Sequence, residues 1–176
     1  YAGSLKATDG TGLPTASHLV LDGGTFVSGA NVTRALGSTG STVQFGPRGG
    51  GFGASAAVSI NIGGSITPGT LTWGGTNFLP DGAPLILGGS GATAALTFQN
   101  PLSLHSQTQT IAVVAGSGDS ETLTGTISNG SLIKNGNGTL TVSVDNSANN
   151  VDTTIANGTL AVSATGKLGS GSALTF

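Results

Sequence analysis

An eight-residue stretch that occurs twice, twenty residues apart, constrains the fold of this chain most strongly. Residues 137–144 read Asn-Gly-Thr-Leu-Thr-Val-Ser-Val, and residues 157–164 read Asn-Gly-Thr-Leu-Ala-Val-Ser-Ala. In each copy an Asn-Gly turn leads into a short strand in which apolar side chains alternate with hydroxyl or small ones, so that one face is apolar. A single such strand cannot bury that face, but a second copy one period later can stack beside it. The repeat therefore predicts a solenoid.

The rest of the chain follows the same scheme of short apolar segments separated by turns. Strands are expected about every 8–12 residues, and no segment with helical periodicity is long enough to form a helix. The clearest predicted strands are residues 18–21, 57–62, 85–87, 95–98 and 110–114, and residues 77–79 are predicted as another. We expect loop and turn structure over residues 1–17, and the greatest flexibility in the glycine-rich segment 46–53.

These features predict an all-β fold, a right-handed parallel β-solenoid (β-helix) with about 20 residues per coil. A Gly-Thr-apolar element recurs at 24–26 and 69–71, and residues 91–98 are echoed by 171–176. Eight or nine coils would make a rod of roughly 40 Å. Residues 1–176 would then be a single solenoid unit, a segment of a longer or polymerised solenoid. An antiparallel β-sandwich is the alternative, because strands joined by Asp-Gly can also pair as hairpins.

The low charge of the chain fits coils that stack in register. Charged residues are 7% of the sequence, against about 25% in ordinary soluble domains. Parallel coils lie about 4.8 Å apart, so equivalent side chains stack and like charges would repel. The five basic residues are scattered and form no basic patch, which argues against binding of nucleic acid or anionic lipid; they are Lys6, Arg34, Arg48, Lys134 and Lys167. No run approaches the roughly 20 apolar residues of a membrane-spanning helix.

One segment carries enough oxygen-bearing side chains to suggest Ca²⁺ binding. Its candidate ligands are Asp145, Asn146, Asn149, Asn150 and Asp152. Ca²⁺ takes six to eight oxygen ligands, but no known calcium-loop spacing is present. A polar coil corner with turn-capping asparagines is the alternative interpretation. Asp119 and Glu121 are a weaker candidate of the same kind.

Catalytic chemistry finds little support in the sequence. The two histidines, His18 and His105, flank predicted strands and are interpreted as surface residues, because no Gly-x-Ser-x-Gly element accompanies them. β-Helix enzymes that act on polysaccharides need paired carboxylates on one face, and the acids here are scattered. The glycine-rich segment 49–53 is no phosphate loop, since no Lys-Ser/Thr follows it. We therefore predict no catalytic residue, no metal site and no cofactor.

Binding of a glycan without cleavage is a second hypothesis. Trp73, Phe52 or Phe78 could form a stacking platform for sugars, although burial in the core is the more ordinary role of Trp73. Segments 46–53 and 145–152 are the loops expected to make such contacts.

The chain also resembles a known repeat family. Residues 132–142 read Leu-Ile-Lys-Asn-Gly-Asn-Gly-Thr-Leu-Thr-Val, which resembles the Leu-x-Lys-x-Gly-x-Gly-Thr-Leu-x-Leu core of the autotransporter-associated β-strand repeat. Residues 153–160 and 166–171 resemble later elements of this repeat, and the specific likeness covers residues 120–176. The linker 145–152 departs from the family pattern, which has an aromatic residue followed by Thr-Gly-Gly.

The resemblance implies a β-helix in a large secreted or surface-displayed passenger protein, without enzymatic activity. We therefore expect an extracellular or bacterial cell-surface structural protein that forms a rod or filament. Its partners would be further copies or further repeats of the same polypeptide, and it would not insert into a membrane. A glycan-binding adhesin and a polysaccharide-acting enzyme are the alternatives.

Overall fold

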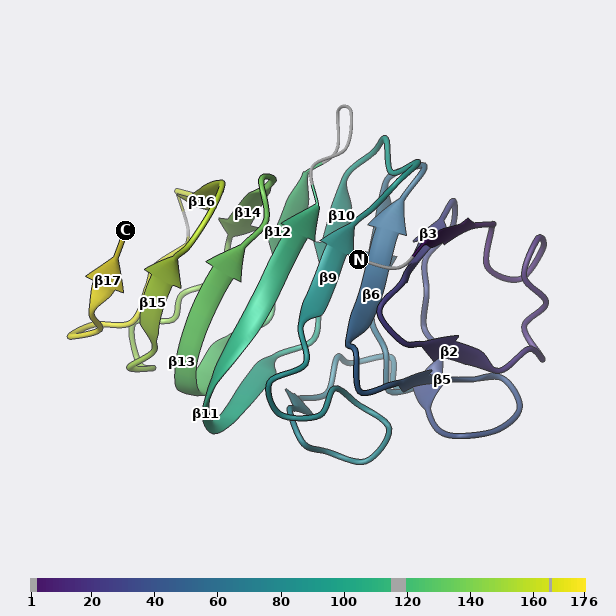
Figure 1. Ribbon diagram of the computed structural model, residues 1–176, viewed down its shortest axis with the longest axis horizontal. Helices are drawn as coiled ribbons and strands as arrows, with labels where there is room; N and C mark the ends of the chain where they lie inside the picture. Colours follow the sequence, from purple (N-terminus) through teal and green to yellow (C-terminus); the bar gives the residue numbers. More distant parts are fainter. Residues whose placement is uncertain (1–2, 115–119, 165) are drawn as a thin grey trace.

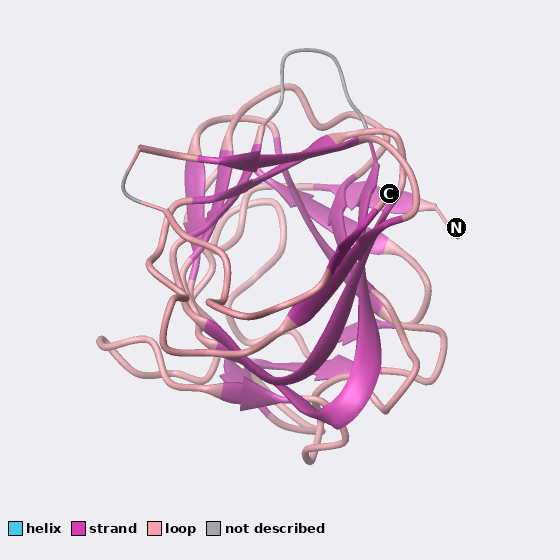
Figure 2. Cartoon of the chain, turned by 90° about the vertical axis from the view of Figure 1, so that its left-hand side faces the viewer, coloured by secondary structure: helices cyan, strands magenta, loops and turns pink. Residues whose placement is uncertain are grey.

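The chain winds into a parallel β-solenoid of about seven turns, with about 24 residues per turn and no helix. The structure is a computed structural model that describes residues 3–114, 120–164 and 166–176. Figure 1 shows the coils following one another along the long axis, and Figure 2 shows strands and loops wrapped around a common interior. Because the described residues contain no helix, none of them forms a helix that could cross a membrane.

Three parallel sheets make up the walls. The largest has nine strands, with eight in one path and β8 (Leu71–Thr72) beside β11; the path is β1 (Ser4–Lys6), β3 (Thr25–Ser28), β6 (Gly50–Ala54), β9 (Leu85–Gly88), β11 (Leu102–Val114), β13 (Ile127–Asn135), β15 (Asp152–Ile155) and β17 (Leu174–Thr175). The second contains β16 (Thr159–Val162), β14 (Thr139–Val142), β12 (Glu121–Leu123), β10 (Leu96–Phe98) and β7 (Val58–Ile60). The third contains β2 (Leu19–Leu21), β5 (Thr42–Phe45) and β4 (Ala35–Leu36).

The sequence repeat predicts its own pairing correctly. Strand β14 pairs with β16 in parallel, with Thr139 opposite Thr159 and Leu140 opposite Leu160. The hairpin suggested by the Asp-Gly turn after residue 21 does not form, because β2 pairs with β5 while β3 pairs with β1 and β6. All pairings between the described strands are parallel, which excludes the antiparallel sandwich.

The predicted coil length of about 20 residues is too short for the chain as a whole. It holds at the C-terminal end, but Gly50 of β6 pairs with Leu85 of β9, 35 residues on. The additional residues form the loops between β7 and β9. Parallel pairing fixes the positions of the strands but leaves the length of each corner loop free. The single 20-residue repeat could therefore not predict the mean coil length of the whole chain. Fewer coils result than the eight or nine expected.

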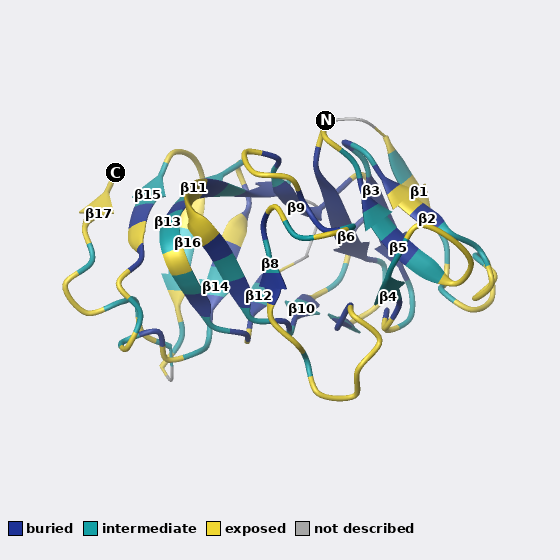
Figure 3. Ribbon diagram, turned by 90° about the horizontal axis from the view of Figure 1, so that it is seen from below, coloured by how far each residue is buried: buried dark blue, intermediate teal, exposed yellow. Residues whose placement is uncertain are grey.

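The interior is built from columns of stacked apolar side chains. Phe26, Phe52, Leu87 and Val113 occupy successive positions across four strands of the large sheet, and all four are buried. Figure 3 shows this burial concentrated along the middle strands, with exposed residues in the loops and near the C-terminus. Each coil therefore buries the apolar face of its neighbours, as the repeat requires.

The glycine-rich segment 46–53 was expected to be the most flexible part of the chain, and this prediction is wrong. Residues 50–54 form β6, which is buried at every position. A Cβ atom on Gly51 would overlap the carbonyl oxygen of Ile86 in the next coil. The glycines here permit close approach of two backbones and do not confer flexibility, while Phe52 between them fills the interior.

Two smaller expectations also differ from the structure. Residues 77–79 are not a strand, because Asn77 has a φ of 62° and lies in a turn. The first 17 residues, expected to be loop and turn, contain β1. This strand pairs with β3, which the periodicity of the sequence did not reveal.

We expect Gly51→Ala to destabilise the fold by about 2 kcal/mol or more, because its methyl group would push two coils apart. Gly69→Ala is the control, since a Cβ atom there meets nothing within 4 Å, and it should change stability by less than about 0.5 kcal/mol. Urea unfolding followed by circular dichroism measures both. Equal stability of the two variants would contradict the role assigned to Gly51.

Candidate functional site

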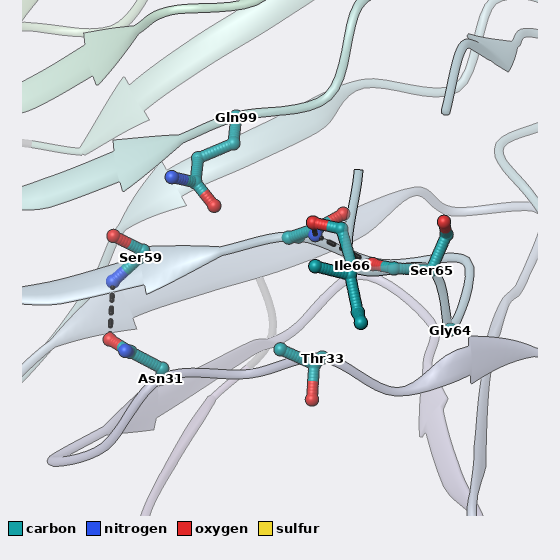
Figure 4. A pocket seen from close by; sticks show the side chains of 8 residues that line it. Asn31, Thr33, Ser59, Gly64, Ser65, Ile66 and Gln99 are labelled. Carbon is teal, nitrogen blue, oxygen red and sulfur yellow. Dashed lines mark hydrogen bonds between the residues drawn. The ribbon is translucent and has the colours of Figure 1, made fainter. Parts of the chain in front are cut away.

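An uncharged cleft in the N-terminal half of the solenoid is a candidate site. It has a volume of about 360 Å³ and is lined by Asn31, Thr33, Ser59, Asn61, Gly64, Ser65, Ile66 and Gln99. Strand β7 contributes Ser59, and the residue after β10 contributes Gln99. Figure 4 shows Gln99 on one side, Asn31 and Thr33 on the other, and Ile66 between them.

Hydrogen bonds between coils hold the cleft in shape. The side-chain oxygen of Asn31 accepts a bond of 2.8 Å from the backbone N–H of Ser59. Backbone bonds between Val32 and β7 satisfy the same strand edge. The buried amide of Asn61 donates to the carbonyls of Ser65 and Ile66 and so fixes the loop that forms one wall.

A second buried asparagine supports that loop from below. The side chain of Asn100 accepts a bond from the N–H of Ile62 and donates to the carbonyls of Ile62 and Gly69. Both ends of the loop are thereby tied to the next coil. Side-chain hydrogen bonds therefore connect the loop that forms one wall of the cleft to the stacked coils.

Several polar groups in the cleft have no hydrogen-bond partner among the residues that the structure describes. Within the described part of the chain, the hydroxyls of Thr33, Ser59 and Ser65 and the side-chain amide of Gln99 make no hydrogen bond. The neighbouring charge of Arg34 does not reach the cleft, because its guanidinium is buried against Asp9 at 2.6 Å and donates to the carbonyls of Pro14 and Ser17. The cleft therefore offers both hydrogen-bond donors and hydrogen-bond acceptors, and no charged side chain lines it.

The residues proposed as a sugar-stacking platform lie in the core. Trp73, Phe52 and Phe78 are at most 3% exposed. Trp73 packs edge-on against Phe78 with ring centroids 5.4 Å apart, and its indole N–H donates to the carbonyl of Ala83. These aromatic rings cannot touch an external glycan, so the stacking prediction is wrong and core burial of Trp73 is confirmed. Residues 50–53 of the segment 46–53 belong to the buried strand β6, so they cannot contact a glycan as a loop.

Most oxygen-bearing side chains of segment 145–152 are used in turns and between coils. Asn146 is buried and accepts from the N–H of Ile127 in the preceding coil, and Asp152 accepts from the N–H of Ala173 in the following one. Asp145 forms an ion pair of 2.7 Å with Lys167. This arrangement agrees with a coil corner, and it removes Asn146 from the proposed Ca²⁺ ligands. Among the described residues, no three His, Asp or Glu side chains are grouped to hold a metal ion.

We expect the contribution of Asp145 to stability to depend on pH. Hydrogen bonds from Lys167 and then from Ser147 hold the pKa of the Asp145 carboxyl below its ordinary value of 3.8. The folded state therefore binds this proton more weakly than the unfolded state, so the stabilisation is present above pH 3.8 and is lost as the pH falls through the folded pKa.

Asp145→Asn should accordingly destabilise the protein slightly near neutral pH, and the difference from wild type should shrink at pH 3. Urea unfolding at both pH values measures this difference. Asn150→Ala is the control, because it changes the same loop without removing a titratable group. Its effect on the free energy of unfolding should be the same at both pH values. A constant difference for Asp145→Asn would refute the assignment.

The histidines do not form a triad. His105 is exposed at the bend of β11 and its Nδ1 lies 2.9 Å from the Asp81 carboxylate, which also accepts from Gln109. The adjacent Ser106 donates to Asn129. His18 contacts the carbonyl of Gly37. No described serine is hydrogen-bonded to either imidazole.

The remaining acidic candidate is internal. Glu121 is 1% exposed and occupies an inward column position between Leu96 and Leu140. It therefore cannot act as a surface ligand. Asp119 lies outside the described residues.

A buried lysine is another charged residue in the interior of the described chain, and the sequence alone assigned it no structural role. Lys134 follows Leu85 and Ile111 in an inward column of the large sheet and is fully buried. Its ammonium donates to the carbonyls of Gly136, Gly138 and Asn157 at 2.5–2.8 Å. Burial lowers the pKa of Lys134 by desolvating its charge, while the three carbonyls provide acceptors for its protons. The ammonium thus joins the turn of one coil to the turn of the next.

Lys134→Met should destabilise the fold by about 2 kcal/mol or more, because it removes the three hydrogen bonds that the charged ammonium donates to the turns of two coils. Lys6→Met is the control, since Lys6 is exposed, and it should cost less than about 0.5 kcal/mol. Chemical unfolding gives both values. A loss for Lys134→Met no larger than that of the control would show that the ammonium does not fasten the coils.

Comparison with known proteins gives no relative for this chain: no family model matches, and no match is found among curated proteins or solved structures.

Proposed function

We propose that this chain is a non-catalytic structural segment of an extracellular or cell-surface rod. The observation that carries the proposal is the uninterrupted large sheet, which runs from β1 to β17 with parallel pairing at every step. A stack of this kind provides length and stiffness, because each coil is hydrogen-bonded to the next along the whole axis.

The resemblance of residues 120–176 to the autotransporter-associated β-strand repeat supports the same proposal. The Lys and two Gly residues of the resembling motif are Lys134, Gly136 and Gly138, and the ammonium of the first contacts the carbonyls of the other two. Their spacing thus has a structural explanation that involves no catalysis.

The distribution of acidic residues gives less support to the enzymatic alternative. Within the described chain, four aspartates each form an ion pair with a different basic residue at separate places along the solenoid; the pairs are Asp9–Arg34, Asp22–Arg48, Asp81–His105 and Asp145–Lys167. A pair of carboxylates facing one substrate, as hydrolysis of a glycoside requires, is not among these arrangements.

The two ends of the solenoid are proposed to bind further coils, either of the same polypeptide or of a second copy. The strands β1 and β17 are the outer strands of the large sheet, and unpaired strand edges favour addition of another strand. Apolar side chains are exposed near both ends, namely Leu5, Val20, Val162, Leu174 and Phe176.

Electron microscopy and sedimentation at increasing protein concentration test self-stacking. We expect linear particles that lengthen with concentration, and we expect Leu174→Lys to shorten them because it places a charge against the next coil. Thr108→Lys, at an exposed position away from the ends, should leave them unchanged. Discrete single particles at every concentration would refute stacking between copies.

The proposed location is tested separately in the organism that makes the protein. An antibody against the folded chain should label intact cells or their surroundings. Labelling that requires permeabilised cells would refute an extracellular role.

A further inference from the structure

The cleft beside β7 has a chemistry that the proposed structural role does not use. Its lining is made of amide, hydroxyl and backbone groups with one apolar side chain. A volume of about 360 Å³ lies at the lower end of the range of small-molecule sites.

The hydrogen-bonding groups favour a ligand that both donates and accepts. Hydroxyls donate and accept, and a side-chain amide offers a carbonyl oxygen and an NH₂ group side by side. Gln99 and the hydroxyls of Thr33 and Ser59 are available in this way. Since the side-chain oxygen of Asn31 is already bonded to β7, its NH₂ group is the part left for a ligand.

The absence of charged side chains from the lining selects against ions. No basic side chain is available to offset the charge of an anion, since the guanidinium of Arg34 is only 4% exposed and occupied by Asp9. No carboxylate lines the cleft to offset the charge of a metal ion. A neutral polyhydroxylated ligand satisfies the available groups without leaving a buried charge unpaired.

A peptide added as an extra strand is also disfavoured. Strand β7 is the outer strand of the five-stranded sheet, but Val32 already exchanges backbone hydrogen bonds with Ser59 and Asn61 along its edge. The main-chain groups that would bind an incoming strand are therefore occupied.

Apolar contact in the cleft comes from Ile66, whose side chain is fully exposed. Hydrogen bonds from Asn61 and Asn100 to the carbonyls of Ile66 and Gly69 hold the backbone of this loop beside the cleft. It could cover the C–H face of a sugar ring, a role that the buried aromatic residues cannot perform.

The outer face of the second sheet extends the cleft along the solenoid. Ser59 is followed in register by Thr97, Thr122 and Thr141 on successive strands. All four are partly exposed, and they repeat at the spacing of the coils, about 4.8 Å. A linear chain seated in the cleft would therefore find a row of hydroxyl groups beyond it.

From these observations we propose that the cleft binds an uncharged oligosaccharide, with Gln99, Asn31, Thr33 and Ser59 as hydrogen-bonding residues and Ile66 as the apolar contact. This site differs from the aromatic platform and from the loops first expected to bind a glycan. It does not depend on the structural role or on the self-stacking proposed above.

Isothermal titration of the intact chain with neutral hexasaccharides, namely β-1,3-glucan, β-1,4-glucan and β-1,4-mannan, tests the proposal. Sulfated and uronic-acid hexasaccharides are titrated alongside. We expect at least one neutral ligand to bind, with affinity unchanged between about 0.05 and 0.5 M salt because no charged side chain takes part. Absence of binding by every neutral ligand, or equal or tighter binding of the charged ones, would overturn the proposal.

Variants then locate the site. Gln99→Ala and Asn31→Ala should each weaken binding at least tenfold, and Thr33→Val tests one hydroxyl with little change in shape. Gln107→Ala, an exposed glutamine at the bend of β11, is the matched control and should bind like wild type. Unfolding curves verify that each variant is folded. Unaltered affinity of Gln99→Ala and Asn31→Ala, or equal weakening by Gln107→Ala, would place the ligand elsewhere and overturn the proposal.

Discussion

In-register stacking of parallel coils is the constraint on which the rest of this structure depends. Each side chain lies directly over an equivalent one about 4.8 Å away, so a property chosen at one position is repeated along the axis. Apolar residues form columns such as Phe26, Phe52, Leu87 and Val113. Ser and Thr form the corresponding outer rows. Repeated charges would repel in the same geometry, which accounts for a chain with 7% charged residues.

Two of the few charged side chains connect loops and turns that the pairing of strands leaves unconnected. Arg34 binds Asp9 and carbonyls of the N-terminal loop, and Lys134 binds the turns of two successive coils. Asparagines act similarly without charge, since Asn100 and Asn146 accept backbone bonds from neighbouring coils. Buried groups of this kind hold corner loops against the coils, including the loop that forms one wall of the cleft. The proposed rod and the proposed sugar site therefore depend on the same fastening.

The fold was more predictable than the site. Alternation in 137–144 and 157–164 correctly predicted two adjacent parallel strands, because strand periodicity and repeat length are local properties. The glycine-rich β6 was misread as flexible, because the cause of its composition is the backbone of Ile86 in another coil. The cleft was missed for the same reason. Asn31, Ser59 and Gln99 belong to three coils, and no local pattern distinguishes them from other polar residues on the outer surface.

The sequence by itself determined that the chain is all-β and carries little charge, and it favoured a parallel solenoid over an antiparallel sandwich. These properties follow from short-range alternation and from composition, which a single coil already contains. Tertiary structure alone decided the parallel pairing of the strands, the mean coil length, the burial of Lys134, and the grouping of uncharged polar residues beside β7. Those outcomes depend on which residues of different coils come to lie in register, and the lengths of the intervening loops set that register.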